Sequence, residues 1–200
     1  MSYRLKLGFL ASRNGSSFRA IVEAIEQDAL AAEARLLVSN NRTAGALEFA
    51  AAHGVPSQVV ATQADPHAAD RRLCAAMQEA GVELIVLSGY LRRLGPATLQ
   101  AFQNRVINIH PGPLPEFGGE GMYGRRVHEA VIAARARASG ITIHLVDEVY
   151  DHGAILARRE VALQPGETAD TLEARVTALE PGFFVETLGR IAAGELILPS

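Results

Sequence analysis

The segment NIHPGPLP contains two side chains whose types and spacing could do chemistry. Asn108 and His110 stand two residues apart at the end of an apolar run that is typical of a strand. Alternate residues of a strand point to the same face, so the carboxamide and the imidazole are expected to lie together. Such a pair can stabilise a developing oxyanion and transfer a proton. The alternative is a polar pair that only closes the strand, and the prolines that follow favour the functional interpretation.

A second polar segment, HLVDEVYDHG, supplies further acid–base groups: His144, Asp147, Glu148, Asp151 and His152. A carboxylate from this segment could raise the basicity of His110 and hold its ring in one tautomer. Histidine and aspartate also bind zinc or iron, but their spacing here matches no recognised metal motif. A polar hairpin turn is the remaining interpretation, because Asp and Gly are common in turns.

The segment SRNGSS, residues 12–17, lies between an expected strand and an expected helix. Free backbone N–H groups at a helix start, helped by serine hydroxyls, can bind an anion such as a phosphate. The segment lacks the GxGxxG and GxxxxGK[ST] patterns, which argues against a dinucleotide or a nucleoside triphosphate. A simple capped turn, in which Ser and Asn are common, explains the segment equally well.

Composition limits the possible chemistry. The 200 residues fit one domain, and 48% hydrophobic and 20% charged residues are typical of a soluble globular protein. Lys6 is the only lysine, which argues strongly against Schiff-base and Walker-type lysine chemistry. Anions must therefore be held by arginine, backbone N–H groups or hydroxyls. Cys74 stands alone, so an internal disulfide is excluded and a reduced, intracellular thiol is expected.

Neither nucleic acid nor a membrane is an expected partner. The formal net charge is −3, and the arginine pairs at 71–72 and 125–126 have no interleaved aromatic residues. No apolar stretch approaches the ~18 residues that can span a bilayer. The first residues do not resemble a signal peptide, so a cytoplasmic location is expected.

The first half of the chain predicts the scaffold for these segments. Strands are expected at 5–11, 34–38, 57–60, 84–88 and 106–110, and helices at 16–27, 44–53, 66–80 and 96–102. Strict alternation is typical of a doubly wound, Rossmann-like α/β fold with a mostly parallel sheet and helices on both faces. Ligands bind such sheets at the carboxyl ends of the strands, where Asn108 and His110 lie.

The second half predicts an antiparallel extension of the same sheet. A loop rich in Gly and Pro at 111–124 precedes a helix at 125–138 and two alternating strands at 140–146 and 154–163. A helical region follows at 168–193, in which Pro181 and Gly182 predict a kink or a break. We expect one domain over residues 1–200, with a Rossmann-like half at 1–107 and a catalytic half at 108–200.

In combination, these segments resemble the folate-dependent glycinamide ribonucleotide formyltransferases of the formyltransferase superfamily. The resemblance covers nearly the whole chain through NGSSFRAI, VSNN, LSGYLRRLGP, NIHPGPLP and the Asp of DEVYDHG. NIHP-x-x-LP followed by H-x6-D-x-G is a specific combination. The resemblance implies formyl transfer from 10-formyltetrahydrofolate to the amine of glycinamide ribonucleotide, with no metal and no covalent enzyme intermediate.

The resemblance also implies roles for individual residues. The family's catalytic trio falls on Asn108, His110 and Asp151. Asn108 and protonated His110 are expected to stabilise the tetrahedral oxyanion, while Asp151 supports His110 and organises a water that relays the proton. The ribonucleotide substrate is assigned to Asn14, Gly15, Ser16, Ser17, Gly112 and Glu180. The folate co-substrate is assigned to Tyr90, Leu91, Arg92, Leu94, Asp147 and Val149.

The sequence departs from the family pattern around the acceptor side. Gly112–Pro113 replaces the common Ser/Ala–Leu, Glu116–Phe117 replaces Lys–Tyr, and the loop at 118–124 is longer than in many relatives. A formyltransferase that acts on another small amine, such as an amino sugar, therefore stays open. A non-enzymatic phosphate-binding module is a further alternative, against which the intact catalytic trio argues. The expected partners are small molecules, and the expected assembly is a monomer or a homodimer.

Overall fold

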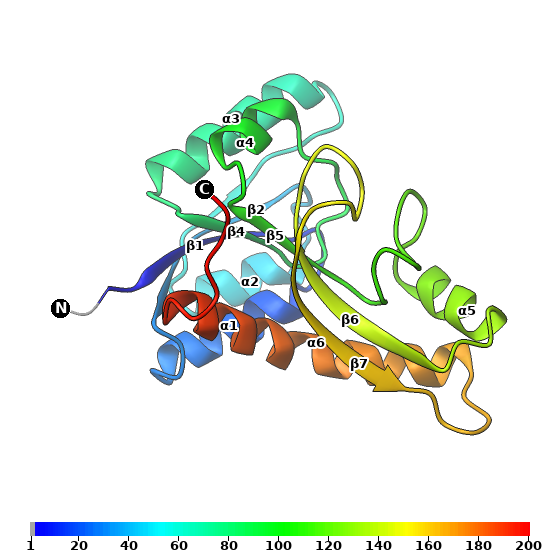
Figure 1. Cartoon of the computed structure of the whole chain (residues 1–200). Coiled ribbons are helices and arrows are strands. Elements are labelled where there is room, and N and C mark those ends of the chain that lie inside the picture. Colours follow the sequence, from blue (N-terminus) through cyan, green and yellow to red (C-terminus); the bar gives the residue numbers. More distant parts are fainter. Residues whose placement is uncertain (1–2) are drawn as a thin grey trace.

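A computed structural model describes residues 3–200 and contains one seven-stranded sheet in the order β3-β2-β1-β4-β5-β6-β7 (Figure 1). The strands are β1 (Leu5–Leu10), β2 (Ala32–Ser39), β3 (Ser57–Val59), β4 (Leu84–Leu87), β5 (Val106–His110), β6 (Ala138–Leu145) and β7 (Ile155–Ala162). The first five run parallel, and β6 and β7 are each antiparallel to the preceding strand. The predicted fold class is therefore confirmed.

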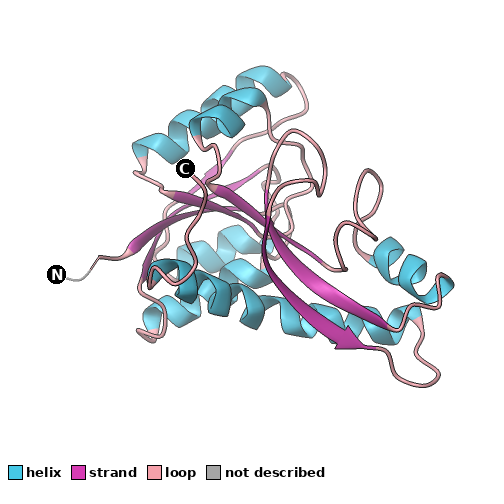
Figure 2. Ribbon diagram, viewed as in Figure 1, coloured by secondary structure: helices cyan, strands magenta, loops and turns pink. Residues whose placement is uncertain are grey.

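Helices cover both faces of this sheet. They are α1 (Ser16–Glu26), α2 (Gly45–Ala52), α3 (Pro66–Glu79), α4 (Pro96–Ala101), α5 (Arg125–Ala133) and α6 (Ala169–Ala192). In the view of Figures 1 and 2, α3 and α4 lie above the sheet, whereas α1, α2 and α6 lie below it. The short helix α5 packs beside one end of α6.

The central strands are buried on both faces, which explains why they appear as apolar runs in the sequence. In β1, Leu7 and Phe9 belong to the hydrophobic core under α1 and α6, whereas Leu10 belongs to the core under α3. A Cβ atom at Gly8 would lie 2.5 Å from Met77 Sδ, so the glycine allows α3 to pack closely against the sheet.

Helix α5 is shorter than the sequence predicts. It ends at Ala133 rather than at 138, and β6 begins at Ala138 rather than at 140. Arg135 has a left-handed φ of 49°, and its N–H and that of Ala136 donate to the carbonyls of Ile132 (3.0 Å) and Val131 (3.3 Å). This is the Schellman arrangement that usually contains glycine, so an arginine in that position gives no recognisable stop signal.

Of the kink or break predicted at Pro181 and Gly182, a break is excluded, because the 24-residue helix α6 continues through both residues. Proline removes one helical N–H, which normally destabilises a helix interior. Buried side chains anchor the helix on both sides of the proline: Leu172 and Val176 before it, and Phe183, Phe184 and Leu188 after it. Most helical stability in proteins comes from such tertiary packing, and here it outweighs the local penalty.

None of the helices between residues 3 and 200 combines the length and the hydrophobicity that crossing a lipid bilayer requires.

Candidate active site

Loops that carry the predicted site residues converge at one end of the sheet. Residues 11–15, 88–95 and 111–124 follow the carboxyl ends of the parallel strands β1, β4 and β5. Ser12 joins the first two loops, because its N–H donates to Gly89 O (3.2 Å) and its Oγ accepts from Leu91 N (2.8 Å). The β6–β7 loop meets the third, since Gly119 N donates to Asp151 Oδ2 at 3.0 Å.

The pairing of β5 with β6 sets the centre of the site. Asn108 lies opposite His144 and His110 lies opposite Thr142 in the antiparallel register. Directly opposite residues and alternate residues share a face of the sheet, so all four side chains project to the same side. Asn108 Nδ2 and His144 Nε2 are 3.2 Å apart.

Asp151 lies between the two histidines. Its Oδ2 is 3.4 Å from His110 Nδ1, and its Oδ1 is 3.5 Å from His144 Nε2. Both imidazole side chains are only 3% exposed and the carboxylate is 11% exposed. The predicted trio of Asn108, His110 and Asp151 is thus assembled in one place, and His144 joins it as a fourth member.

The hydrogen bonds determine where protons can reside in this cluster. His110 Nε2 is 2.7 Å from Phe117 O and His144 Nδ1 is 2.8 Å from Leu145 O. A carbonyl oxygen only accepts, so both of these nitrogens carry a hydrogen. When Asn108 Nδ2 donates to His144 Nε2, that nitrogen holds a lone pair and His144 is neutral. His110 Nδ1, facing Asp151, is then the site for the additional proton.

Burial and charge act in opposite directions on these rings. Burial lowers the pKa of His110 below its ordinary value, while the Asp151 carboxylate and the Phe117 carbonyl oppose that shift. Burial also lowers the pKa of His144, against the Leu145 carbonyl and Asp151. Asp151 is therefore the group that favours an imidazolium in an otherwise desolvated site.

The segment after β5 wraps around the His110–Asp151 pair. The buried hydroxyl of Thr142 donates to Gly112 O (2.8 Å) and accepts from Leu114 N (3.3 Å). The Leu114–Pro115 peptide bond is cis. A Cβ atom at Gly118 would lie 2.3 Å from Leu114 Cδ2 and 3.0 Å from Asp151 Cβ, so this glycine allows the segment to approach the carboxylate closely.

The start of α1 has the features expected of an anion site. Gly15 precedes the helix with a left-handed φ of 62°, and no side chain caps the helix or places an acidic group in its first turn. Phe18 N donates to Ser88 Oγ at 3.0 Å. Asn14 and Ser16 are exposed and Ser17 is buried. The structure thus leaves backbone N–H groups at a helix N-terminus, which favours bound anions.

The residues assigned to the folate occupy two segments. Tyr90, Leu91, Arg92 and Leu94 follow β4, where Leu91 is 55% exposed and Leu94 is buried. Asp147 and Val149 lie on the β6–β7 loop, and Asp147 Oδ1 accepts from Val149 N at 2.8 Å. Burial raises the pKa of Tyr90 to about 12, so its phenol stays neutral at physiological pH.

Glu180 on α6 is a half-buried carboxyl. Burial raises its pKa to about 7. Between residues 3 and 200, its carboxyl forms neither a hydrogen bond nor an ion pair, whereas Glu173 and Glu186 on the same helix pair with arginines. Gly112, the other residue assigned to the acceptor side, is buried beside His110, and a Cβ there would lie 3.3 Å from His110 Nε2.

Sequence reasoning did not assign roles to three residues of this region. His144 was visible in HLVDEVYDHG, but only the β5–β6 register places it opposite Asn108. Thr142 precedes it by two residues, so the period of two along a strand could have indicated a shared face. Arg93, rather than its neighbour Arg92, contacts the β6–β7 loop by donating to Glu148 O and lying over the Tyr150 ring.

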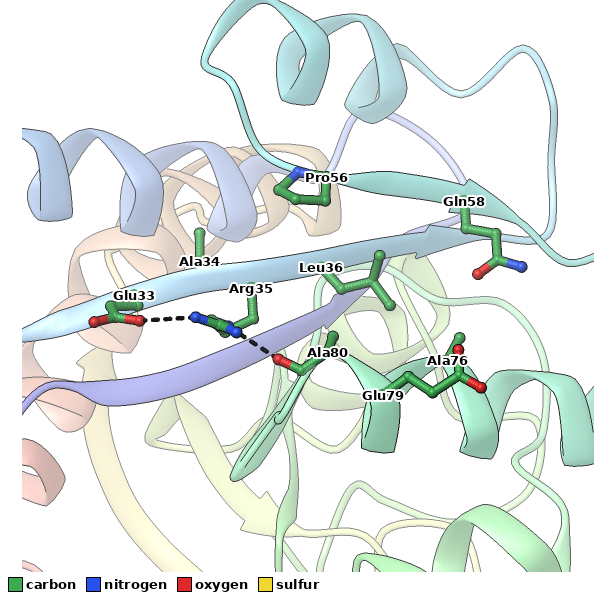
Figure 3. A pocket seen from close by; sticks show the side chains of 9 residues that line it. All are labelled: Glu33, Ala34, Arg35, Leu36, Pro56, Gln58, Ala76, Glu79 and Ala80. Atoms are coloured by element: carbon green, nitrogen blue, oxygen red, sulfur yellow. Dashed lines mark hydrogen bonds and ion pairs between the residues drawn. The ribbon is translucent and has the colours of Figure 1, made fainter.

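A separate hollow lies far from these loops. It has a volume of about 620 Å³ and is lined by the first half of β2, the start of β3 and the end of α3 (Figure 3). Its arginine, Arg35, donates a hydrogen bond to Ala80 O at 2.9 Å and forms an ion pair with Glu33 at 3.3 Å. The hollow contains none of the predicted site residues and lies toward the amino end of β2.

Comparison with known proteins identifies the family of the chain. Residues 5–188 match the family model described as formyl transferase, and the chain belongs to that family.

Curated relatives are named phosphoribosylglycinamide formyltransferase. The Bacillus subtilis protein is 34% identical over 196 residues, covering 95% of this chain and 98% of that protein. The chloroplastic Arabidopsis thaliana protein is 38% identical over 192 residues, which are 94% of this chain but 65% of that protein. The chain therefore spans somewhat less than two thirds of the plant relative.

Solved structures of proteins with equivalent names superpose on this chain. A glycinamide ribonucleotide transformylase from Symbiobacterium toebii superposes with a TM-score of 0.89 at 28% identity, covering 100% of this chain and 93% of that one. A phosphoribosylglycinamide formyltransferase from Coxiella burnetii superposes with a TM-score of 0.86 at 32% identity, covering 96% and 88% of the two chains.

Proposed function

We propose that this protein transfers the formyl group of 10-formyltetrahydrofolate to the amine of glycinamide ribonucleotide, a step of purine biosynthesis. The observation that carries the proposal is the cluster of buried His110 with half-buried Asn108 and Asp151 at the carboxyl end of β5. The names of the bacterial and plant relatives support the same acceptor.

The cluster supplies the groups that acyl transfer to an amine needs. As the amine nitrogen bonds to the formyl carbon, the formyl oxygen becomes an oxyanion. Asn108 Nδ2 has a second N–H beyond the one directed at His144, and this N–H is available to the oxyanion. His110 Nε2–H supplies the second donor, because an oxyanion is a stronger acceptor than the Phe117 carbonyl that holds it in the free protein.

Asp151 has two tasks in this mechanism. Its carboxylate stabilises the His110 imidazolium at 3.4 Å, which strengthens the Nε2–H donor. It also orients a water that carries the proton from the attacking amine to the folate nitrogen as the carbon–nitrogen bond to the folate breaks. The chemistry uses neither a metal nor a covalent bond to the protein.

The two substrates divide between the halves of the chain. The phosphate is assigned to the Rossmann-like half at 1–107, on the uncapped α1 start formed by Asn14, Gly15, Ser16 and Ser17. Gly112 and Glu180 face the rest of the ribonucleotide. The folate lies between Tyr90, Leu91, Arg92 and Leu94 on one side and Asp147 and Val149 on the other. We assign the enzyme to the cytoplasm, as a monomer or a homodimer.

One alternative acceptor is kept because a specific observation favours it. Glu116, Phe117 and the long Gly-rich loop differ from the family pattern, and Phe117 O directly contacts His110. These differences lie on the acceptor side, so a second small amine such as an amino sugar is the competing substrate.

A spectrophotometric assay of the folate product distinguishes these possibilities. Glycinamide ribonucleotide is compared with amino sugars and other small amines at equal concentration, with His110→Ala as the blank. The proposal predicts the highest kcat/KM for glycinamide ribonucleotide. Turnover with an amino sugar alone would establish the alternative acceptor instead.

A further inference from the structure

The β6–β7 loop that carries Asp151 has little support of its own. Residues 147–150 are all exposed. The hydrogen bonds within the loop join Val149 N to Asp147 Oδ1 (2.8 Å), His152 N to Val149 O (3.4 Å) and His152 Nδ1 to Asp147 Oδ2 (3.3 Å). Asp151 itself has a left-handed φ of 57°, a conformation that favours glycine over residues with a side chain. A loop of this kind needs external contacts to keep one conformation.

Arg93 provides the external contact for the outer part of the loop. Its guanidinium donates to Glu148 O, and its Cζ lies 5.6 Å from the centre of the Tyr150 ring. Within residues 3–200, the hydrogen bond from Arg93 is the only one that reaches residues 147–150 from outside the loop. The inner part of the loop is held separately, by Gly119 and by the two histidines.

The segment from which the Arg93 side chain extends is held in place by its neighbours. Leu91 N donates to Ser12 Oγ at 2.8 Å, and Leu94 is buried in the core under α3. Arg93 therefore extends from a segment that is held on both sides of it. It reaches a loop of which only the inner part has other contacts. The two segments that it joins are also the two to which the folate is assigned.

We propose that Arg93 is a positioning residue that latches the 147–153 loop onto the 89–95 segment and thereby holds the Asp151 carboxylate against His110. The proposal rests on the proposed function, since it gives a role within that reaction. Arg93 acts through the loop and contacts none of the reacting atoms. Its loss lets the loop move, so Asp151 spends less time at 3.4 Å from His110 Nδ1.

Hydrogen–deuterium exchange of the substrate-free, full-length protein tests the latch without any assumption about the reaction. The informative amides are those of Val149 and His152, whose hydrogen bonds depend on the loop conformation. In Arg93→Ala these amides are expected to exchange about tenfold faster than in the wild type. Their exchange rate in Arg93→Lys is expected to lie between those of Arg93→Ala and the wild type. Arg72→Ala, which removes an exposed arginine of α3, is the matched control and is expected to match the wild type.

Kinetics then test the positioning role. Arg93→Ala is expected to lower kcat about tenfold and to raise the KM for the folate, while the KM for the ribonucleotide stays within twofold. The alkaline limb of its kcat profile, where the His110 imidazolium loses its proton, is expected to move to lower pH, because a displaced Asp151 supports the imidazolium less. Tyr150→Phe keeps the aromatic ring and is expected to behave as wild type.

Two results would overturn the latch: exchange in Arg93→Ala that equals that of Arg72→Ala, or faster exchange with unchanged kcat and pH profile. Absence of formyl transfer in the wild type would instead reject the proposed function. In that case the exchange comparison would still decide whether Arg93 holds the loop.

Discussion

Replacement of Asp151 by asparagine removes the charge of the candidate site with little change in shape. The carboxylate oxygens lie 3.4 Å and 3.5 Å from nitrogens of two buried imidazoles. The asparagine carbonyl can still accept the hydrogen bond from Gly119 N. The substitution therefore isolates the electrostatic contribution of the residue.

The size of this electrostatic contribution can be worked out from the distance between Asp151 and His110. Coulomb's law with an effective dielectric constant of about 20 gives about 5 kcal/mol for unit charges 3.4 Å apart. Part of this energy offsets the desolvation of the two groups, and a positioned acid–base partner contributes about 10²- to 10⁴-fold to a rate. We therefore expect Asp151→Asn to lower kcat by about 10²- to 10⁴-fold, which corresponds to about 3–5 kcal/mol.

The pH dependence provides an independent readout. Asp151 raises the pKa of His110 against the effect of burial, so its removal lowers the pKa and shifts the imidazolium population to lower pH. The folate-product assay, run from pH 5 to pH 9, should show an acid-shifted profile with partial recovery at the lowest pH. Glu148→Gln removes an exposed charge from the same loop and serves as the matched control.

The reasoning would be refuted by an Asp151→Asn enzyme that retains turnover within threefold of wild type with an unshifted pH profile. A melting temperature close to that of the wild type confirms that both proteins are folded.

Three further predictions follow from other parts of the structure. His110→Ala should abolish formyl transfer while the melting temperature changes little; near-normal turnover would reject the proposed mechanism. Glu180→Gln should be more stable than wild type at pH 8. The pKa of the Glu180 carboxyl is about 7 in the folded protein against the usual 4.5, so the wild-type protein loses stability as pH rises from 4.5 through 7. Thermal melts at pH 5 and pH 8 check whether the difference in stability shrinks at the lower pH. Gly153→Ala should destabilise the protein by about 1–3 kcal/mol, the usual cost of overpacking, because its Cβ would lie 1.9 Å from Leu145 O; an unchanged urea midpoint would contradict this.

The sequence predicts most of the sheet because each central strand is apolar on both faces and each helix follows in strict alternation. The errors occur where tertiary contacts override local signals. Pro181 predicts a kink or a break, yet buried residues on both sides of it keep α6 continuous, so no break occurs. Arg135 gives no sign of a helix end, although it adopts the left-handed conformation that terminates α5.

The candidate site could be predicted in part for a similar reason. A period of two places Asn108 beside His110 from sequence alone. The position of His144 depends on the register between β5 and β6, which is a long-range property. The contact of Arg93, rather than Arg92, with the β6–β7 loop depends on the path of two loops, which no local pattern encodes.

The most direct test of the proposed function follows the formyl carbon itself. Wild-type protein is incubated with glycinamide ribonucleotide and 10-formyltetrahydrofolate carrying ¹³C in the formyl group, and the products are separated and analysed by mass spectrometry. Our account predicts that the label appears in formylated ribonucleotide with wild-type protein and is absent from it with His110→Ala. Label that remains on the folate, is released as formate or appears in the ribonucleotide equally with His110→Ala would contradict it.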